Sequence, residues 1–508
     1  MPWRPLTHTL PGPLSRLSFG PVKGHYLILA GAIGLLILQR TSFFYGHFGY
    51  DDLYYAELAT RLLHGQVDFG DHYVYRIVPI LATALSYALF GVNDAASSLP
   101  AGLATLGILL LLLAYYRSRP AWQYGLAVAM YFGMRWNFFY ADKLMPDVFV
   151  ALFAFAGWLA YVRREHLGEW SGPALMAVSL FLAFNSKGTI ILLLPLLLVY
   201  FAVDVVRGRW AWWLRVAATG VPLLLVYFGA VTVLTGSPFS RFTAIVANQY
   251  LNPCSYDQLP WEHLVERLTT GYWSLLRDAR LLPHLWVAVG GMLWFTVSRT
   301  KGDRTLRFFP ATALLCFGAM NFMTISLTSY NPICLDARHI LLFSPILAVC
   351  SVDTLVTILR QSGVPTDRWW FTLAVAVAAL IFLKPAHDLA VYARSLNYVD
   401  VRAALRTTLA TLPRPATVYG SRVTINYGRY YTGFTDTGLR FVPLDSLPAC
   451  RERPSTDPPD FLLRTWYTDW HARASADAQT AEAVERGYVL RAAEQSTPVV
   501  QAEQLTCP

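Results

Sequence analysis

Long apolar runs recur along the chain from about residue 25 to residue 384, and they leave few folds open to it. A bilayer crossing needs about 20 mostly apolar residues, and within lipid only helices and closed barrels satisfy every backbone hydrogen bond. The runs here are continuous and lack the alternation of a barrel strand. The sequence therefore predicts a polytopic α-helical membrane protein with about 11 transmembrane helices. The expected spans are residues 25–43, 95–116, 121–137, 147–162, 171–186, 188–206, 212–235, 283–299, 308–326, 339–359 and 369–384.

The distribution of charge predicts how these spans are oriented. Charged residues make up only 14% of the 508 residues, against about 25% in an ordinary soluble domain. The formal net charge of +9 would suit a nucleic-acid binder if the basic residues formed one face. They instead concentrate in the short loops that face the cytoplasm when the N-terminus is inside. The charge therefore indicates topology and excludes nucleic acid as a partner. We expect a cytoplasmic N-terminus and, with an odd number of spans, a C-terminal tail on the outer side.

The chain divides into a transmembrane catalytic module, residues 1–384, and a soluble tail, residues 385–508. The tail holds as many acidic as basic residues, as a soluble domain does. Its patterns predict a small α/β domain. The expected elements are helices over residues 399–412 and 423–431 and strands over 416–420, 460–464 and 487–492. No Asn-x-Ser/Thr glycosylation site occurs in the chain, which favours a bacterial inner membrane with the tail in the periplasm.

Two further outer segments, residues 41–94 and 236–283, are too long to be simple connectors. In the first, Asp51 to His64 and Ile77 to Phe90 read as amphipathic helices that should lie along the membrane surface. An oxidising outer compartment permits two disulfides, Cys254 with Cys334 and Cys450 with Cys507. Free or buried thiols account for the same cysteines equally well.

Charged residues gather at the predicted outer ends of several spans. Asp51 and Asp52 follow the first span, Asp147 opens the fourth, Lys187 lies in a tight turn, and Arg338 precedes the tenth. Each has an ordinary explanation as a helix cap, a snorkelling cation or a member of an ion pair. Together they place carboxylates and cations at one face, where ionisable residues are costly and indicate function.

The chemistry that suits this mixture has a lipid-borne anionic leaving group and a hydroxyl or amine nucleophile. Cations offset the charge that develops on a departing phosphate, while a carboxylate accepts the proton of the nucleophile. A lipid-linked sugar flippase or transporter would instead concentrate ionisable groups near the midplane, where these spans have almost none. A structural or partner-binding membrane protein would give the same residues no joint role.

These residues resemble the motifs of the GT-C membrane glycosyltransferases, in the branch of protein O-mannosyltransferases and lipid A aminoarabinose transferases. Asp51 with Asp52 matches the family's acidic pair after the first span, although its second member is often Glu. The stretch from Arg76 to Gly91 is similar to the family's Lys-Pro-Pro helix that ends in Leu-Phe-Gly. Met145 to Asp147, Asn185 to Gly188 and Ala337 to His339 resemble three later motifs, with His339 in place of the usual Tyr.

The resemblance implies transfer of a sugar from a polyprenyl-phosphate donor to a lipid, glycan or protein acceptor at the outer face, with inversion. It makes Asp51 the general base, with Asp52 and Asp147 as further catalytic carboxylates. The implied donor phosphate ligands are Arg76, Lys187, Arg338 and His339. The candidate sugar contacts are Tyr54, Tyr55, Tyr73 and Tyr75. Some relatives use a divalent cation such as Mg²⁺ or Mn²⁺, which Asp51 and Asp147 would ligate, although two carboxylates alone do not make a metal site. We expect a monomer that also contacts membrane lipids.

Overall fold

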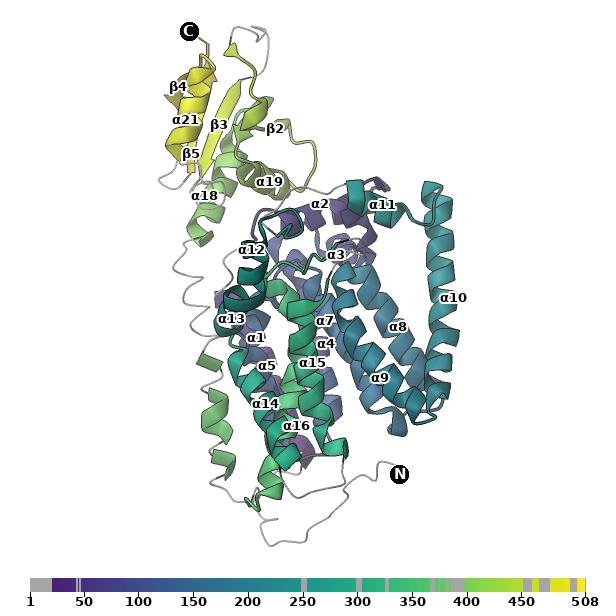
Figure 1. The fold of residues 1–508 in the computed structure, drawn as a ribbon. Helices are drawn as coiled ribbons and strands as arrows, with labels where there is room; N and C mark the ends of the chain where they lie inside the picture. The colour runs from purple at the N-terminus through teal and green to yellow at the C-terminus, as the bar shows by residue number, and fades with distance from the viewer. Residues whose placement is uncertain are drawn as a thin grey trace.

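The computed structural model of the 508-residue chain is dominated by helices, with one small sheet near the C-terminus (Figure 1). It describes residues 21–42, 44, 47–247, 254–297, 304–324, 329–365, 371–373, 375–380, 383–384, 398–450, 459–465, 476–493 and 500–507.

A bundle of apolar helices forms the body of the protein (Figure 1). Each expected span coincides with helical residues, and residues 371–373 and 375–380 represent the last one. The other helices of the bundle are α1 (Pro21–Ser42), α4 (Asp94–Tyr116), α5 (Ala121–Gly133), α7 (Asp147–Val162), α8 (Ser171–Ser186), α9 (Leu194–Val206), α10 (Trp210–Thr235), α14 (Leu282–Val297), α15 (Phe308–Phe322) and α16 (Ser344–Gln361).

Four helices among the described residues are long and apolar enough to cross a membrane by themselves. They cover residues 23–42, 94–116, 188–206 and 210–235, the third including the short helix η3 (Gly188–Leu193) that precedes α9. The pair formed by residues 261–278 and 282–297 passes the same test together but bends by 108°. The number of 11 crossings stays a prediction, as does their direction through the membrane.

Capping residues, prolines and a glycine mark where several of these helices begin or end. The side chain of Asn93 caps α4 by accepting hydrogen bonds from the backbone amides of Ala95 and Ala96, at 3.0 and 2.9 Å. Proline occupies the first turn of α9 and of α16, where its missing N–H costs no hydrogen bond. At the end of α10, Gly236 adopts the left-handed conformation, with φ of 81°.

The two helices expected in the first long loop are present as α2 (Asp51–Leu63) and α3 (Ile77–Phe90), joined by the short helix η1 (His72–Tyr75). They lie at the end of the bundle nearest the C-terminal sheet, which we call the sheet end (Figure 1). Leu81, Leu85 and Leu89 recur at every fourth residue of α3 and are all exposed. This spacing gives α3 one apolar outer side, as an interfacial helix requires.

The second long loop reaches the sheet end as α11 (Ser240–Ala247) and continues through α12 (Trp261–Glu266), η4 (Arg267–Gly271) and α13 (Tyr272–Asp278). A disulfide joins Cys254 in this loop to Cys334, and a second links Cys450 to Cys507. Both disulfides that the sequence permits are therefore present. The first one ties the second long loop to the segment that carries the short helix η6 (Ala337–Ile340).

The C-terminal unit is a five-stranded mixed sheet with helices packed beside it. The strand order is β2-β1-β3-β5-β4, with β1 parallel to β2 and β3, and β5 antiparallel to β3 and β4. The strands are β1 (Ala416–Gly420), β2 (Leu439–Pro443), β3 (Asp460–Thr465), β4 (Val489–Ala492) and β5 (Val500–Thr506). The helices are α18 (Tyr398–Thr411), α19 (Arg422–Tyr431) and α21 (Ala476–Glu485).

Sequence patterns predicted α18, β1, α19, β3 and β4 to within about two residues. They missed α21 and the strands β2 and β5. The β5 sequence, Val500 to Thr506, buries only Val500, Ala502 and Leu505, and most of its side chains are polar, so it lacks an apolar signal.

Candidate active site

Asp51 lies at the sheet end of the bundle as the first residue of α2. One carboxylate oxygen accepts a hydrogen bond of 3.0 Å from the hydroxyl of Tyr73. The other accepts one of 3.0 Å from Nη1 of Arg338, although 287 residues separate the two in the chain. The Asp51 side chain remains 30% exposed. Two partners therefore fix a carboxylate that is still open to a ligand.

Arg338 lies in η6, and Asp336 fixes this segment in two ways. The Asp336 carboxylate caps η6 by accepting a 3.0 Å hydrogen bond from the backbone amide of Arg338. It also forms an ion pair of 2.8 Å with Nε of the same residue. Burial lowers the pKa of Arg338, but Asp336, Asp147 and Asp51 outweigh it, so that this pKa lies above its ordinary value. Arg338 is thus a permanent cation that acts on both Asp51 and Asp147.

A buried ion pair of Asp147 and Lys187 lies close to Arg338. Asp147 is the first residue of α7, and Lys187 lies between α8 and η3. The Lys187 ammonium donates a 2.8 Å hydrogen bond to Oδ1 of Asp147, with the two side chains 10% and 2% exposed. Oδ2 of Asp147 is buried and has no hydrogen-bond partner among the described residues. This carboxylate therefore retains one buried oxygen that could accept a further hydrogen bond.

Two arginines, Arg338 and Arg76, lie near Lys187. Burial lowers the pKa of Lys187, Asp147 partly restores it, and Arg338 and Arg76 lower it again. Arg76 precedes α3; its guanidinium donates a short hydrogen bond to the Tyr55 hydroxyl and lies 4.4 Å from the centre of the Tyr73 ring. Three cations predicted from separate motifs are therefore close enough to act on one anion.

Sequence reasoning missed a fourth cation, Arg241 of α11. It is only 3% exposed, and its charge acts on that of Arg76. Its guanidinium donates hydrogen bonds to the Phe184 carbonyl oxygen, at 2.8 Å, and to the Tyr227 hydroxyl, at 3.4 Å. These described partners are neutral, which is unusual for a buried guanidinium. A lone Arg in the otherwise apolar and hydroxylic sequence of α11 was the available signal.

The other predicted residues divide into two groups. His339 joins the site: its buried ring lies near Lys187 and Asp147, and its Nδ1 lies 3.0 Å from the carbonyl oxygen of Cys334. Asp52 does not face Arg338. Its side chain is completely buried, and its carboxylate accepts hydrogen bonds from four backbone amides, those of Phe48, Gly49, Tyr50 and Leu53. Of the two neighbouring carboxylates, Asp51 is the one with a partly exposed side chain.

The four tyrosines are placed differently from one another. Tyr73 contacts Asp51, and the hydroxyl of its neighbour Tyr54 donates a short hydrogen bond to Asp71. Tyr55 is 1% exposed and Tyr75 4%. The hydroxyl of Tyr75 donates to the carbonyl oxygen of Phe69, and its ring packs with Val231 and Ala244. Tyr54 and Tyr73 are thus the two that a sugar could reach in this arrangement.

The residues present do not fit a bound divalent cation. Among the described residues, no group of three or more His, Cys, Asp or Glu side chains could hold a metal ion. Arg338 already contacts Asp51, and Lys187 already contacts Asp147. Two carboxylates that are each paired with a cation are a poor ligand set for Mg²⁺ or Mn²⁺.

Comparison with solved structures gives the fold. The chain is similar to ArnT from Cupriavidus metallidurans bound to undecaprenyl phosphate, with a TM-score of 0.52 and 16% sequence identity over 96% of this chain and 98% of that one. It is also similar to the same protein in the apo state, with a TM-score of 0.51 and 17% identity over 94% and 97% of the two chains. The chain has the GT-C fold. No protein-family model and no curated protein matches the sequence. The GT-C fold predicted from five short motifs is confirmed over nearly the whole chain.

Proposed function

We propose that the chain is a membrane glycosyltransferase that moves a sugar from a polyprenyl-phosphate donor to an acceptor hydroxyl or amine. The observation that carries the proposal is the contact between Asp51 and Arg338, next to the Asp147–Lys187 pair, at one end of a GT-C fold. ArnT, a lipid A aminoarabinose transferase with this fold, was solved with undecaprenyl phosphate bound. We take a lipid of that class as the carrier of the donor sugar.

In the proposed step, the acceptor oxygen or nitrogen attacks the anomeric carbon of the donor sugar. The bond from that carbon to the phosphate oxygen breaks on the opposite side, and its electron pair leaves with the polyprenyl phosphate. Asp51 takes the proton that the acceptor loses, and Tyr73 and Arg338 hold its two oxygens in place. Attack from the side opposite the leaving group inverts the anomeric configuration.

The cations stabilise the departing phosphate in this proposal. Arg338 and Arg76 both lie within electrostatic range of Lys187, and the repulsion between these cations is relieved when a phosphate enters. Arg241 adds a buried guanidinium with neutral partners beside Arg76. His339 orients the same region through its contact with the Cys334 carbonyl. The phosphate would thus replace part of the negative charge that Asp147 and Asp51 supply now.

The proposal places the sheet end at the outer face of a bacterial inner membrane. It keeps the expected arrangement: about 11 crossings within residues 1–384, a cytoplasmic N-terminus, and residues 385–508 in the periplasm. The enzyme would act as a monomer on an acceptor at that face. Its site has the residues for phosphate departure and proton transfer, and the step above needs no metal ligand from this chain.

The test uses purified protein in lipid nanodiscs. Undecaprenyl phosphate carrying mannose, glucose, galacturonic acid or aminoarabinose is supplied with a bacterial envelope extract as acceptor, and released undecaprenyl phosphate is measured. We expect release with at least one donor, together with a glycosylated acceptor. Binding of every donor without release would contradict the proposal, and movement of the intact donor across the bilayer would favour a flippase.

A further inference from the structure

The turn that leads into α2, residues 47–50, determines where Asp51 lies. Asp52 holds this turn from the protein interior. Its carboxylate accepts hydrogen bonds from the backbone amides of Gly49 and Tyr50, both of 3.1 Å, and from the amide of Phe48. Gly49 has a φ of 87°, a conformation that favours glycine. The turn is therefore held in one shape, and Asp51 follows directly after it.

Helix α19 of the C-terminal unit packs on the outside of the same turn. The Asn426 amide donates a 2.8 Å hydrogen bond to the carbonyl oxygen of Gly49, and the Tyr427 hydroxyl donates to that of His47. A Cβ atom on Gly49 would lie 2.7 Å from a methyl group of Val423 and 2.9 Å from the Tyr427 ring. Only glycine lets α19 approach this closely, so the turn and the helix are fitted to each other.

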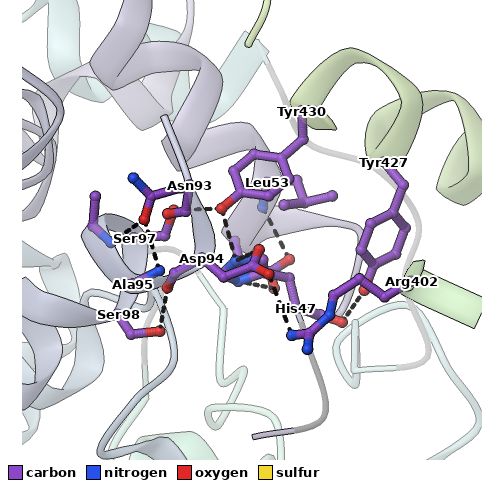
Figure 2. A network of polar contacts seen from close by, with 12 residues as sticks. His47, Leu53, Asn93, Asp94, Ala95, Ser97, Ser98, Arg402, Tyr427 and Tyr430 are labelled. Atoms are coloured by element: carbon purple, nitrogen blue, oxygen red, sulfur yellow. Dashed lines mark hydrogen bonds and ion pairs between the residues drawn. The ribbon is translucent and has the colours of Figure 1, made fainter. Parts of the chain in front are cut away.

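A buried polar network extends this contact to α4 and α18 (Figure 2). Tyr427 and Tyr430 extend from α19 toward His47 (Figure 2). The Tyr430 hydroxyl lies 3.2 Å from Nε2 of His47 and 2.7 Å from the Ser97 hydroxyl. His47 lies between two carboxylates, 3.6 Å from Asp52 and 3.5 Å from Asp94.

Helix α18 completes the network from the other side of Asp94. Nη1 of Arg402 lies 3.2 Å from the Asp94 carboxylate, and Nη2 of Arg406 lies 3.1 Å from it. Asp94 therefore has α18 on one side and His47 on the other. The two carboxylates beside His47 each have further partners: Asp52 accepts hydrogen bonds from backbone amides of the turn, and Asp94 pairs with the two arginines of α18.

We propose that α18 and α19 are positioning elements of the active site: Tyr430 and Asn426 hold the residue 47–50 turn, and the turn holds Asp51 in reach of the acceptor. The inference rests on the proposed role of Asp51 as the base. It gives the C-terminal unit a role in positioning the base, although the unit itself does not contact the substrate. Displacing a general base by about 1 Å can slow a reaction by up to about 100-fold. Small changes in the contact between α19 and the turn should therefore lower kcat.

The test compares Tyr430→Phe and Asn426→Ala with a matched control, Tyr431→Phe. The Tyr431 hydroxyl is buried on the same helix and makes no hydrogen bond within the described part of the chain. We expect kcat to fall by about 10- to 100-fold in Tyr430→Phe and Asn426→Ala, with the KM for the undecaprenyl-phosphate sugar within about twofold of wild type. Tyr431→Phe should keep both constants within about twofold.

Hydrogen exchange provides a readout that needs no substrate. In Tyr430→Phe and Asn426→Ala, the amides of Phe48, Gly49 and Tyr50 should exchange about fivefold faster, as expected for one lost hydrogen bond, while those of Tyr431→Phe should not change. Unchanged exchange and unchanged kcat in both test variants would overturn the positioning role. A wild-type protein that releases no undecaprenyl phosphate from any donor, or an Asp51→Asn variant with full turnover, would instead refute the proposed function.

Discussion

Asp51 and Asp52 are neighbours in the chain but belong to two different regions of the molecule. Asp51 is 30% exposed, and side chains from other elements, those of Tyr73 and Arg338, bind it. Asp52 is completely buried, and the backbone amides of its own turn bind it. Adjacent residues of a helix point about 100° apart, which is enough to place one carboxylate in a ligand site and the other in the protein interior.

The comparison shows that two adjacent acidic residues can have different roles, one in a ligand site and one in a structural network. The Asp51 side holds paired charges that a ligand could rearrange, namely Arg338, Lys187 and Asp147. The Asp52 side holds a network fixed by backbone groups and by the C-terminal unit. Changes on the Asp51 side should therefore act directly on rate and lipid binding. Changes on the Asp52 side should act on stability and order and, through the turn, on kcat, but not on lipid binding.

The largest effect on stability should come from the buried Asp147–Lys187 ion pair on the Asp51 side. Lys187→Met leaves the Asp147 carboxylate buried without its cation and should cost about 3 to 5 kcal/mol of folding free energy. The double variant Lys187→Met/Asp147→Leu should recover most of it, because no charge remains unpaired. Thermal unfolding in detergent measures both. If the single variant unfolds like wild type, the pair is not buried as described.

A smaller loss of stability should follow Asp52→Asn. Asparagine presents only one acceptor oxygen and turns an amide toward the backbone N–H groups of the turn, which costs about 1 to 3 kcal/mol. Undecaprenyl phosphate affinity, measured by titration, should stay within about twofold of wild type. A loss of lipid binding with unchanged unfolding temperature would place Asp52 on the ligand side and break the comparison.

Arg241→Gln should weaken binding of undecaprenyl phosphate by about tenfold, as expected for one charged hydrogen bond to a phosphate. Arg277 is an exposed cation in the same long loop with no assigned role, so Arg277→Gln is the matched control and should bind as wild type does. Equal affinities in both variants would remove Arg241 from the site. A tenfold loss in both would indicate a general effect of charge.

The smallest effect is expected in the pH dependence of lipid binding. The pKa of Lys187 lies below the ordinary value of about 10.5, first because the side chain is buried, so its ammonium loses its proton at lower pH than an exposed lysine. The affinity for undecaprenyl phosphate should fall a few-fold as the pH rises toward about 10.5, because Lys187 loses its charge. Lys187→Arg should keep its affinity to higher pH, because a guanidinium stays charged. Identical profiles would show that Lys187 does not bind the phosphate.

Much of this arrangement could be predicted from local sequence. Continuous apolar runs predicted the bundle, and motifs at their ends predicted Asp51, Asp147, Lys187 and Arg338 as one group. The direction of each side chain could not be predicted: Asp52 and Asp51 are chemically identical, and only the tertiary contacts of the turn separate them. Tyr55 and Tyr75 were candidate sugar contacts together with Tyr73, yet their side chains are buried.

Long-range partners could not be predicted for a similar reason. Tyr430 lies 383 residues from His47, and Arg402 lies more than 300 residues from Asp94. Neither contact leaves a periodic or compositional signal in the chain. Arg241 was overlooked because a single Arg in a loop usually lies in water, whereas here α11 turns it inward against Phe184.

The most direct test measures a single turnover with saturating donor, using preparations of Asp51→Asn and Asp52→Asn that are both folded at the assay temperature. If Asp51 is the base, Asp51→Asn should bind undecaprenyl phosphate as wild type does and transfer sugar about 100- to 10,000-fold more slowly. Asp52→Asn, which loosens the turn before Asp51, should slow transfer about 10- to 100-fold, less than Asp51→Asn does. Full transfer by Asp51→Asn, or a greater loss in Asp52→Asn, would contradict the account.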